Sequence, residues 1–268
     1  MRNITLGQYF PGNSALHRAD PRTKIVLSLS FMATSLLART APEFAILAAL
    51  AACATAASGI PARTILSAVK PVLPLIAFAT VINIFATGGT PIFRIWAIAP
   101  TYEGVGLAFS MTVRILLIIV GASSMMLFTT TPIMLTDGVE RLLKPLKRVR
   151  VPVHELSMMM TIALRFIPTL MDEADKIMKA QASRGADFNE GNPIERMRAF
   201  IPIIIPLFVS AFRRADELAN AMEARCYRGD EGRTRLRQLR MGKLDARFFA
   251  AFGAFAAAFF LIKYAWGL

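Results

Sequence analysis

The chain has 268 residues, 55% of them hydrophobic, and a formal net charge of +13. Soluble domains average roughly 45–50% apolar residues, so this composition, with a mean hydropathy of +0.49, argues against an ordinary soluble domain. The basic residues lie outside the hydrophobic blocks, as in the cytoplasmic loops of membrane proteins, and this explains the charge better than nucleic-acid binding does. Cys53 and Cys226 lie far apart without metal-ligand spacing, which argues against a disulfide or a zinc site.

Hydrophobic blocks predict the membrane-spanning helices. They lie at about residues 25–38, 43–58, 71–87, 105–128 and 246–264. A spanning helix needs about 20 residues, and only the fourth block clearly reaches that length. The first block is short and lies between Lys24 and Arg39, so both side chains would have to extend toward the interfaces if it spans. We therefore expect an all-α integral membrane protein with about five transmembrane helices.

Basic residues alternate between successive loops. They precede the first block, separate the second from the third, and follow the fourth: Arg2, Arg18, Arg22, Lys24, Arg63, Lys70, Arg141, Lys144, Lys147, Arg148 and Arg150. The other two loops carry only Arg39 and Arg94 as cations. By the positive-inside rule, the N-terminus is cytoplasmic and the protein is a multi-pass protein of the cell inner (cytoplasmic) membrane. We expect a membrane domain at 1–128, a cytoplasmic and interfacial domain at 129–245, and a final transmembrane helix at 246–268.

Residues 129–245 show helical periodicity without the length of a spanning segment. A short amphipathic helix is expected from Pro132 to Pro145, because proline opens or ends helices. A long helix follows from His154 to about Arg184, with apolar residues spaced three and four apart. A second long helix is expected from about Pro202 to Arg225. Both long helices should lie at the membrane interface where they start and in water where they end.

The ends of the two long helices repeat one another. ADKIMKAQASRG begins at Ala174 and ADELANAMEARC at Ala215, and each is followed by a polar, glycine-containing break. Arg184 and Arg225 occupy the same place in the repeat, and a guanidinium fork suits carboxylates or carbonyls on a partner. Either arginine alone is equally well explained as a cation at a helix C-terminus, worth about 0.3–1 kcal/mol. Together they indicate that each helix end inserts into a groove, and that the two related grooves belong to a dimeric or pseudo-dimeric partner.

Three segments resemble the transmembrane T components of energy-coupling factor (ECF) vitamin transporters, and the similarity covers nearly the whole chain. They are PGNSALHRADPRTK, TTTPIMLTDGVERLLKPLKRVRVPVHELSMMMTIALRFIPTLMDEADKIMKAQASRGADF and PLFVSAFRRADELANAMEARCYRG. The resemblance implies a non-catalytic subunit that couples two ABC-type ATPase subunits (EcfA-like, a heterodimer) to a substrate-binding S component for uptake of vitamins or other micronutrients. The chain should also contact membrane lipid, and nucleic acid is not expected as a partner. No cofactor is expected on this chain, because ATP and Mg would bind to the ATPases.

The resemblance also implies which residues meet the ATPases. In the family, each of two crossing coupling helices ends in an Ala-Arg-Gly signature that docks in a groove of one ATPase. By position, the signatures fall on Ser183, Arg184 and Gly185, and on Ala224, Arg225 and Cys226. Ser183 replaces an alanine and Cys226 a glycine. The second change affects the helix end if that position needs a left-handed backbone.

Other functions are less well supported. The chain lacks the phosphate-binding motif G-x-x-x-x-G-K-[ST] and shows no paired nucleophile, metal set or catalytic-triad signature, so we expect no enzyme. Arg114 and Asn83 lie inside hydrophobic blocks and are candidate intramembrane functional residues, with Arg114 bonded to Asn83 or to an S component. The alternative hypothesis is a secondary transporter or channel that moves solute through its own helices. It predicts acidic residues within the spans, and none is evident.

Overall fold

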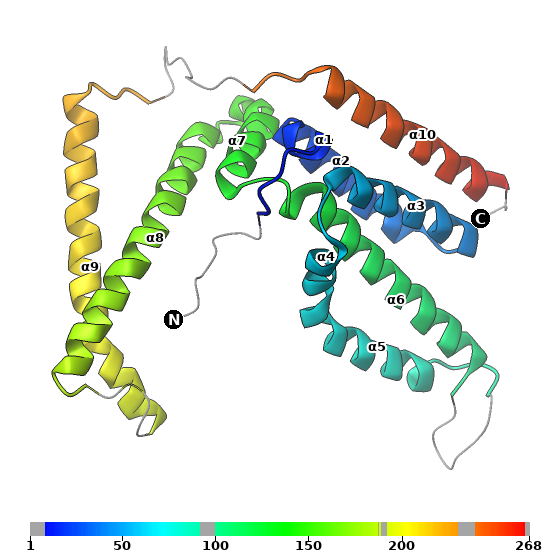
Figure 1. Ribbon diagram of the computed structural model, residues 1–268, viewed down its shortest axis with the longest axis horizontal. Coiled ribbons are helices and arrows are strands. Elements are labelled where there is room, and N and C mark those ends of the chain that lie inside the picture. The colour runs from blue at the N-terminus through cyan, green and yellow to red at the C-terminus, as the bar shows by residue number, and fades with distance from the viewer. Residues whose placement is uncertain (1–8, 92–99, 187, 189–191, 230–238, 266–268) are drawn as a thin grey trace. The chain divides into compact units, whose positions relative to one another are not determined.

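The protein is described by a computed structural model that covers residues 9–91, 100–186, 188, 192–229 and 239–265 (Figure 1). These residues form helices joined by turns, with one isolated β-bridge between Pro91 and Thr101. The predicted all-α fold is therefore confirmed. The chain divides into two compact units, and each is described by itself below. The first unit is Met1–Leu142 with Gln238–Leu268, and the second is Leu143–Arg237.

The first unit contains eight of the described helices and two short helical turns. They are α1 (Ala15–Arg18), α2 (Pro21–Leu37), α3 (Ala41–Ser58), α4 (Ala62–Val69), the 3-10 turn η1 (Lys70–Val72), α5 (Leu73–Ala86), α6 (Tyr102–Ala122), the π-helical turn η2 (Ser123–Leu127), α7 (Pro132–Leu143) and α10 (Lys243–Ala265). Local sequence explains where they begin. The Asp20 carboxylate accepts the Arg22 N–H at the start of α2, and Thr101 accepts the Gly104 N–H at the start of α6.

Four described helical segments are long and apolar enough to cross a membrane. They are Ala41–Ser58, Ala62–Ala86, Tyr102–Leu127 and Lys243–Ala265. Large side chains point outward from them, with Phe78 65% and Phe109 71% exposed, as expected for surfaces that face lipid. The expected first span is present as α2, but its 17 residues extend about 25 Å, less than the roughly 30 Å of a bilayer core.

The prediction that Lys24 extends toward an interface is wrong. Lys24 is only 3% exposed, and its Nζ donates to the Thr129 carbonyl oxygen at 2.9 Å and to Thr130 Oγ1 at 3.2 Å. Protein oxygens thus replace water around the ammonium group, which makes burial of the charge tolerable. Arg39, at the other end of α2, is exposed as expected.

Helix α6 packs against α2, α3, α4 and α5, and α10 packs against α2 and α3. The core between these helices is built around Phe31 and Phe259, which are 0% and 1% exposed. Gly121 of α6 lies directly against the Phe31 ring, and a Cβ atom at this position would overlap that ring. The close approach of α6 to α2 therefore depends on the absence of a side chain at Gly121.

The second unit consists of the 3-10 turn η3 (Lys144–Val149), α8 (Val153–Ser183) and α9 (Pro193–Ala224). The first long helix begins and ends within one residue of its predicted bounds. The second begins at Pro193, nine residues before the predicted start at Pro202, which instead lies inside the helix. Pro193 fits the first helical position because its missing N–H has no partner there in any case. Helices α8 and α9 cross each other (Figure 1).

Candidate functional site

A Schellman motif closes the end of α8. The Ala186 N–H donates to the Gln181 carbonyl at 3.0 Å, and the Gly185 N–H donates to the Ala182 carbonyl, also at 3.0 Å. Gly185 has φ +90°, a backbone conformation that side chains disfavour. Arg184 is the C-cap residue, directly before this turn. The sequence SRG thus stops the helix and fixes the backbone from which the Arg184 side chain leaves.

Helix α9 ends in the same way. The Tyr227 N–H donates to the Met222 carbonyl at 3.1 Å, and the Cys226 N–H donates to the Glu223 carbonyl at 2.8 Å. Cys226 has φ +54°, so the residue that stands where the family signature has glycine does adopt the left-handed conformation. Such a conformation costs a non-glycine residue about 1–2 kcal/mol. The substitution therefore keeps the geometry of the helix end and stores strain in it.

The two helix ends are exposed. We call Ser183, Arg184 and Gly185 the first tip and Ala224, Arg225 and Cys226 the second tip; all six residues are exposed. The backbone N–H groups of Arg184 and Arg225 donate to the Gln181 and Met222 carbonyls, whereas neither guanidinium forms a hydrogen bond or an ion pair with a residue that the structure describes. Each arginine is exposed at the end of a helix, where a cation is favoured, and its guanidinium fork suits a partner's acceptor groups. Both tips lie at the ends of their helices, and their binding to ATPases stays a prediction.

A polar contact at the helix crossing was missed by the sequence analysis. The Glu173 carboxylate of α8 accepts hydrogen bonds from Ser210 Oγ at 2.5 Å and from Arg214 Nη2 at 2.9 Å, both on α9. The Ser210 hydrogen bond and then the Arg214 guanidinium lower the pKa of Glu173 below its ordinary value of 4.5. A signal was present in the sequence, because Glu173 and Arg214 are opposite charges directly before the two repeated segments, at the same offset of 41 residues.

Arg114 and Asn83 are not joined to each other. Arg114 Nη2 donates to the Ala38 carbonyl at 2.5 Å, and its guanidinium carbon lies 5.8 Å from the centre of the Phe44 ring. Asn83 Nδ2 donates to the Ala79 carbonyl of its own helix at 2.8 Å. The suggested hydrogen bond between the two residues is therefore wrong. Arg114 faces protein, as expected, and places its charge at the negative C-terminal end of α2.

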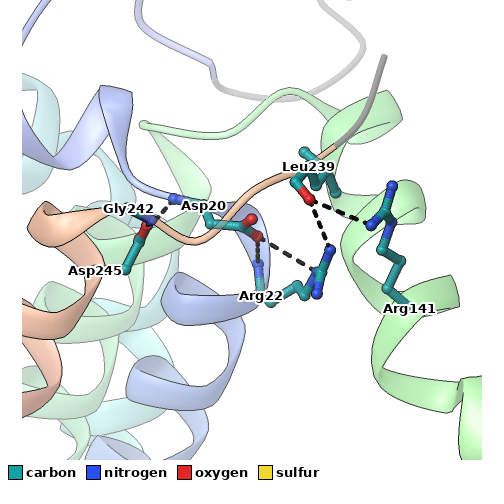
Figure 2. Close-up of polar contacts among 6 residues, drawn as sticks. All are labelled: Asp20, Arg22, Arg141, Leu239, Gly242 and Asp245. Atoms are coloured by element: carbon teal, nitrogen blue, oxygen red, sulfur yellow. Dashed lines mark hydrogen bonds and ion pairs between the residues drawn. The ribbon is translucent and has the colours of Figure 1, made fainter. Parts of the chain in front are cut away.

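One carbonyl oxygen near the start of α10 accepts hydrogen bonds from two arginines (Figure 2). The Leu239 carbonyl oxygen accepts from Arg22 Nη2 at 3.2 Å and from Arg141 Nη1 at 3.3 Å. Arg22 belongs to α2 and Arg141 to α7, so the segment before α10 is fixed to both helices. We call Arg22, Arg141 and Leu239 the carbonyl clamp.

A second contact beside the carbonyl clamp joins the starts of α2 and α10 (Figure 2). Asp245 Oδ1 accepts the Asp20 N–H, and Asp245 Oδ2 accepts the Gly242 N–H, both at 2.8 Å. Asp245 is 4% exposed, and both of its oxygens have backbone donors near the N-terminus of α10, where a negative charge is favoured. The sequence shows two helix-start aspartates, but it carries no sign that they meet across 225 residues.

Apolar helices of spanning length, joined to a pair of crossed amphipathic helices with exposed arginine tips, define an all-α multi-pass membrane protein. Residues 12–236 match the model of the family CbiQ, described as cobalt transport protein. The chain is 57% identical over 245 residues to the energy-coupling factor transporter transmembrane protein EcfT of Ruminiclostridium cellulolyticum, covering 91% of each chain. The proteins of the same name from Thermosediminibacter oceani and Bacillus subtilis are 48% and 41% identical over 266 residues, at least 98% of each chain. The chain belongs to this family, the transmembrane T components of ECF transporters.

Proposed function

We propose that this T component transmits ATP-driven motion from two ABC-type ATPase subunits to a substrate-binding S component, for uptake of a vitamin or another micronutrient. In this proposal the chain is not a catalyst, and ATP and Mg bind to the ATPases. The coupling domain, residues 129–245, and the N-terminus lie on the cytoplasmic side of the inner membrane. The family supports this proposal, since its members are components of energy-coupled transporters.

The observation that carries the proposal is the pair of matching tips. Each Schellman motif stops its helix at the arginine, so the Arg184 and Arg225 side chains start from fixed backbone positions. Docking then orders side-chain torsions without also ordering a loop, which lowers the entropic cost of binding. Both guanidinium forks are exposed and can bind acceptor groups in two related grooves. Two such grooves are what a dimer of related ATPases offers.

The helix faces before the tips support a second contact, with the membrane interface or the S component. Exposed apolar residues cover these parts of α8 and α9: Leu156, Met159, Met160, Ile167, Ile201, Ile204, Ile205, Phe208 and Phe212. A surface of this kind is unfavourable in water and marks a contact with protein or lipid. We therefore propose that the apolar starts of the two helices contact lipid or the S component and that the polar tips contact the ATPases.

The test is co-purification of the tagged chain from its native membrane in mild detergent, followed by mass spectrometry. We expect two ATPase subunits and an S component with the parent chain. In the variant Arg184→Ala/Arg225→Ala, the amount of co-purified ATPase should fall at least about tenfold, because a central interface arginine contributes about 2 kcal/mol or more to binding. Arg213→Ala, which removes an exposed arginine of α9 away from its tip, is the matched control. Normal assembly and uptake by the double variant would refute the proposal, and uptake by the chain alone would support the secondary-transporter hypothesis.

A further inference from the structure

The ion pair at the crossing joins Glu173 and Arg214, the residues directly before the two repeated segments. Glu173 and Arg214 are separated by 41 positions. Arg184 and Arg225 are separated by the same number, as are the first residues of the repeated segments, Ala174 and Ala215. When two elements are related by a twofold axis, a residue that contacts its own equivalent lies on that axis. The Glu173–Arg214 pair therefore marks a pseudo-twofold axis through the crossing of α8 and α9.

The parts of α8 and α9 that run from this axis to the tips, here called the arms, are equal in length. Arg184 follows Glu173 by eleven residues, and Arg225 follows Arg214 by eleven residues. At a rise of 1.5 Å per residue, each arm is about 16 Å long. The two tips are thus equally far from the crossing, and both arms end in the same Schellman geometry.

The chemistry at the axis suits a contact between equivalent positions. Identical ionised residues there would repel each other, whereas a glutamate and an arginine attract. Ser210 and Arg214 are four residues apart on α9, so they lie on the same face, one turn from each other. Because Ser210 binds Glu173 Oε1 and Arg214 binds Oε2, the carboxylate is held between two successive turns of α9. A slip of one helix along the other would break at least one of these bonds.

We propose that Glu173, Ser210 and Arg214 are positioning residues that form a pin at the crossing. The pin fixes the register and the crossing angle of α8 and α9, so that the two tips keep a set separation and move together. Its role in transport rests on the proposed function, but its effect on tip separation does not. Without the pin, α8 and α9 still pack against each other, but their crossing angle is free to vary.

The direct test measures tip separation by electron–electron resonance between spin labels. Labels at Ala182→Cys and Glu223→Cys occupy equivalent exposed positions, nine residues beyond Glu173 and Arg214. The native thiols are removed by Cys53→Ala and Cys226→Gly. A change of about 20° in crossing angle, the ordinary scatter of helix packing, shifts the label separation by about 3–4 Å. We expect one narrow distance for the parent chain in lipid nanodiscs.

Charge reversal provides the decisive comparison. Glu173→Arg alone places two guanidinium groups at the axis and should shift or broaden the distance distribution. Adding Arg214→Glu restores opposite charges and should restore the parent distribution. The matched control is Asp172→Asn, which removes an exposed neighbouring charge and should leave the distribution unchanged. A single reversal that behaves like the parent overturns the pin, and so does a double reversal that fails to restore the narrow distance while remaining folded.

A second measurement connects the pin to transport. In the assembled transporter, the single reversal should lose uptake per ATP hydrolysed while both ATPases remain bound, and the double reversal should recover it. Because the distance measurement uses the chain alone, its outcome is independent of whether the ATPases bind the tips. Failure of the proposed function would instead appear as absence of ATPases in the co-purification. Unchanged uptake per ATP with an altered tip distance would overturn the transport role of the pin.

Discussion

Replacing Cys226 by glycine should stabilise the end of α9. Cys226 has φ +54°, so glycine relieves strain at this position without altering the backbone path. The relief is about 1–2 kcal/mol, and the extra freedom of glycine in the unfolded chain offsets about 0.4–1 kcal/mol of it, leaving a net gain of about 0.5–1 kcal/mol. This gain corresponds to about two- to fivefold less frequent opening of the last turn.

The assay is amide hydrogen exchange at Tyr227, whose N–H donates to the Met222 carbonyl and closes the Schellman motif. Exchange of the Tyr227 amide should slow by the same factor in Cys226→Gly. The matched change at α8 is Gly185→Ala, which introduces a side chain at φ +90° and should speed exchange of the Ala186 amide.

Cys226→Val sharpens the comparison, because a β-branched residue tolerates positive φ less well than cysteine does. Exchange at Tyr227 should therefore become slower with glycine and faster with valine than in the parent chain. If exchange at Tyr227 is the same with glycine, cysteine and valine, the left-handed turn does not limit the stability of this helix end and the reasoning is wrong.

Two further predictions follow from the crossing and from the core. Because the pKa of Glu173 is lowered on folding, its ion pair stabilises the crossing above the ordinary value of 4.5, and this stabilisation is lost as the pH falls through the lowered pKa. The label distance should accordingly stay constant from neutral pH down to about 4.5 and broaden only at lower pH, whereas Glu173→Gln should show no such transition. Gly121→Leu should destabilise the first unit by about 1–3 kcal/mol through overlap with the Phe31 ring. A fluorescence-detected thermal melt in detergent should show a lower midpoint than for Gly106→Leu, where a side chain meets open space. Equal midpoints would mean that α6 and α2 can separate at no cost.

The parts of the fold that follow from local sequence were predicted well. Hydrophobic blocks located helices at all five expected places, and the periodicity of three and four located α8 to within one residue. The repeat located both tips, because a Schellman motif depends on a few consecutive residues. The presence of Cys226 where the family signature has glycine left open whether this position needs a left-handed backbone, and its φ of +54° shows that the backbone is left-handed there.

The parts that depend on which helices meet were not predictable from one sequence. Lys24 looked like an interfacial cation, but its direction is set by the Thr129 carbonyl, more than one hundred residues away. For the same reason, the sequence did not show that Arg114 bonds to the Ala38 carbonyl at the end of α2 and not to Asn83. The start of α9 was misplaced because a proline fits both the first turn of a helix and, at a cost, its interior, so Pro202 gave an ambiguous boundary.

The carbonyl clamp has a consequence for how the molecule is organised. Arg141 lies just before the chain leaves the first unit at Leu142, and Leu239 lies just after it returns at Gln238. Their hydrogen bond therefore holds the outgoing segment, the end of α7, next to the returning segment before α10. An insertion with adjacent ends leaves its host intact, which is the circumstance in which proteins exchange whole segments. The segment 143–237, which contains the crossed helices, thus leaves and re-enters the first unit at two adjacent points, so its replacement would not require a change in how the spans pack.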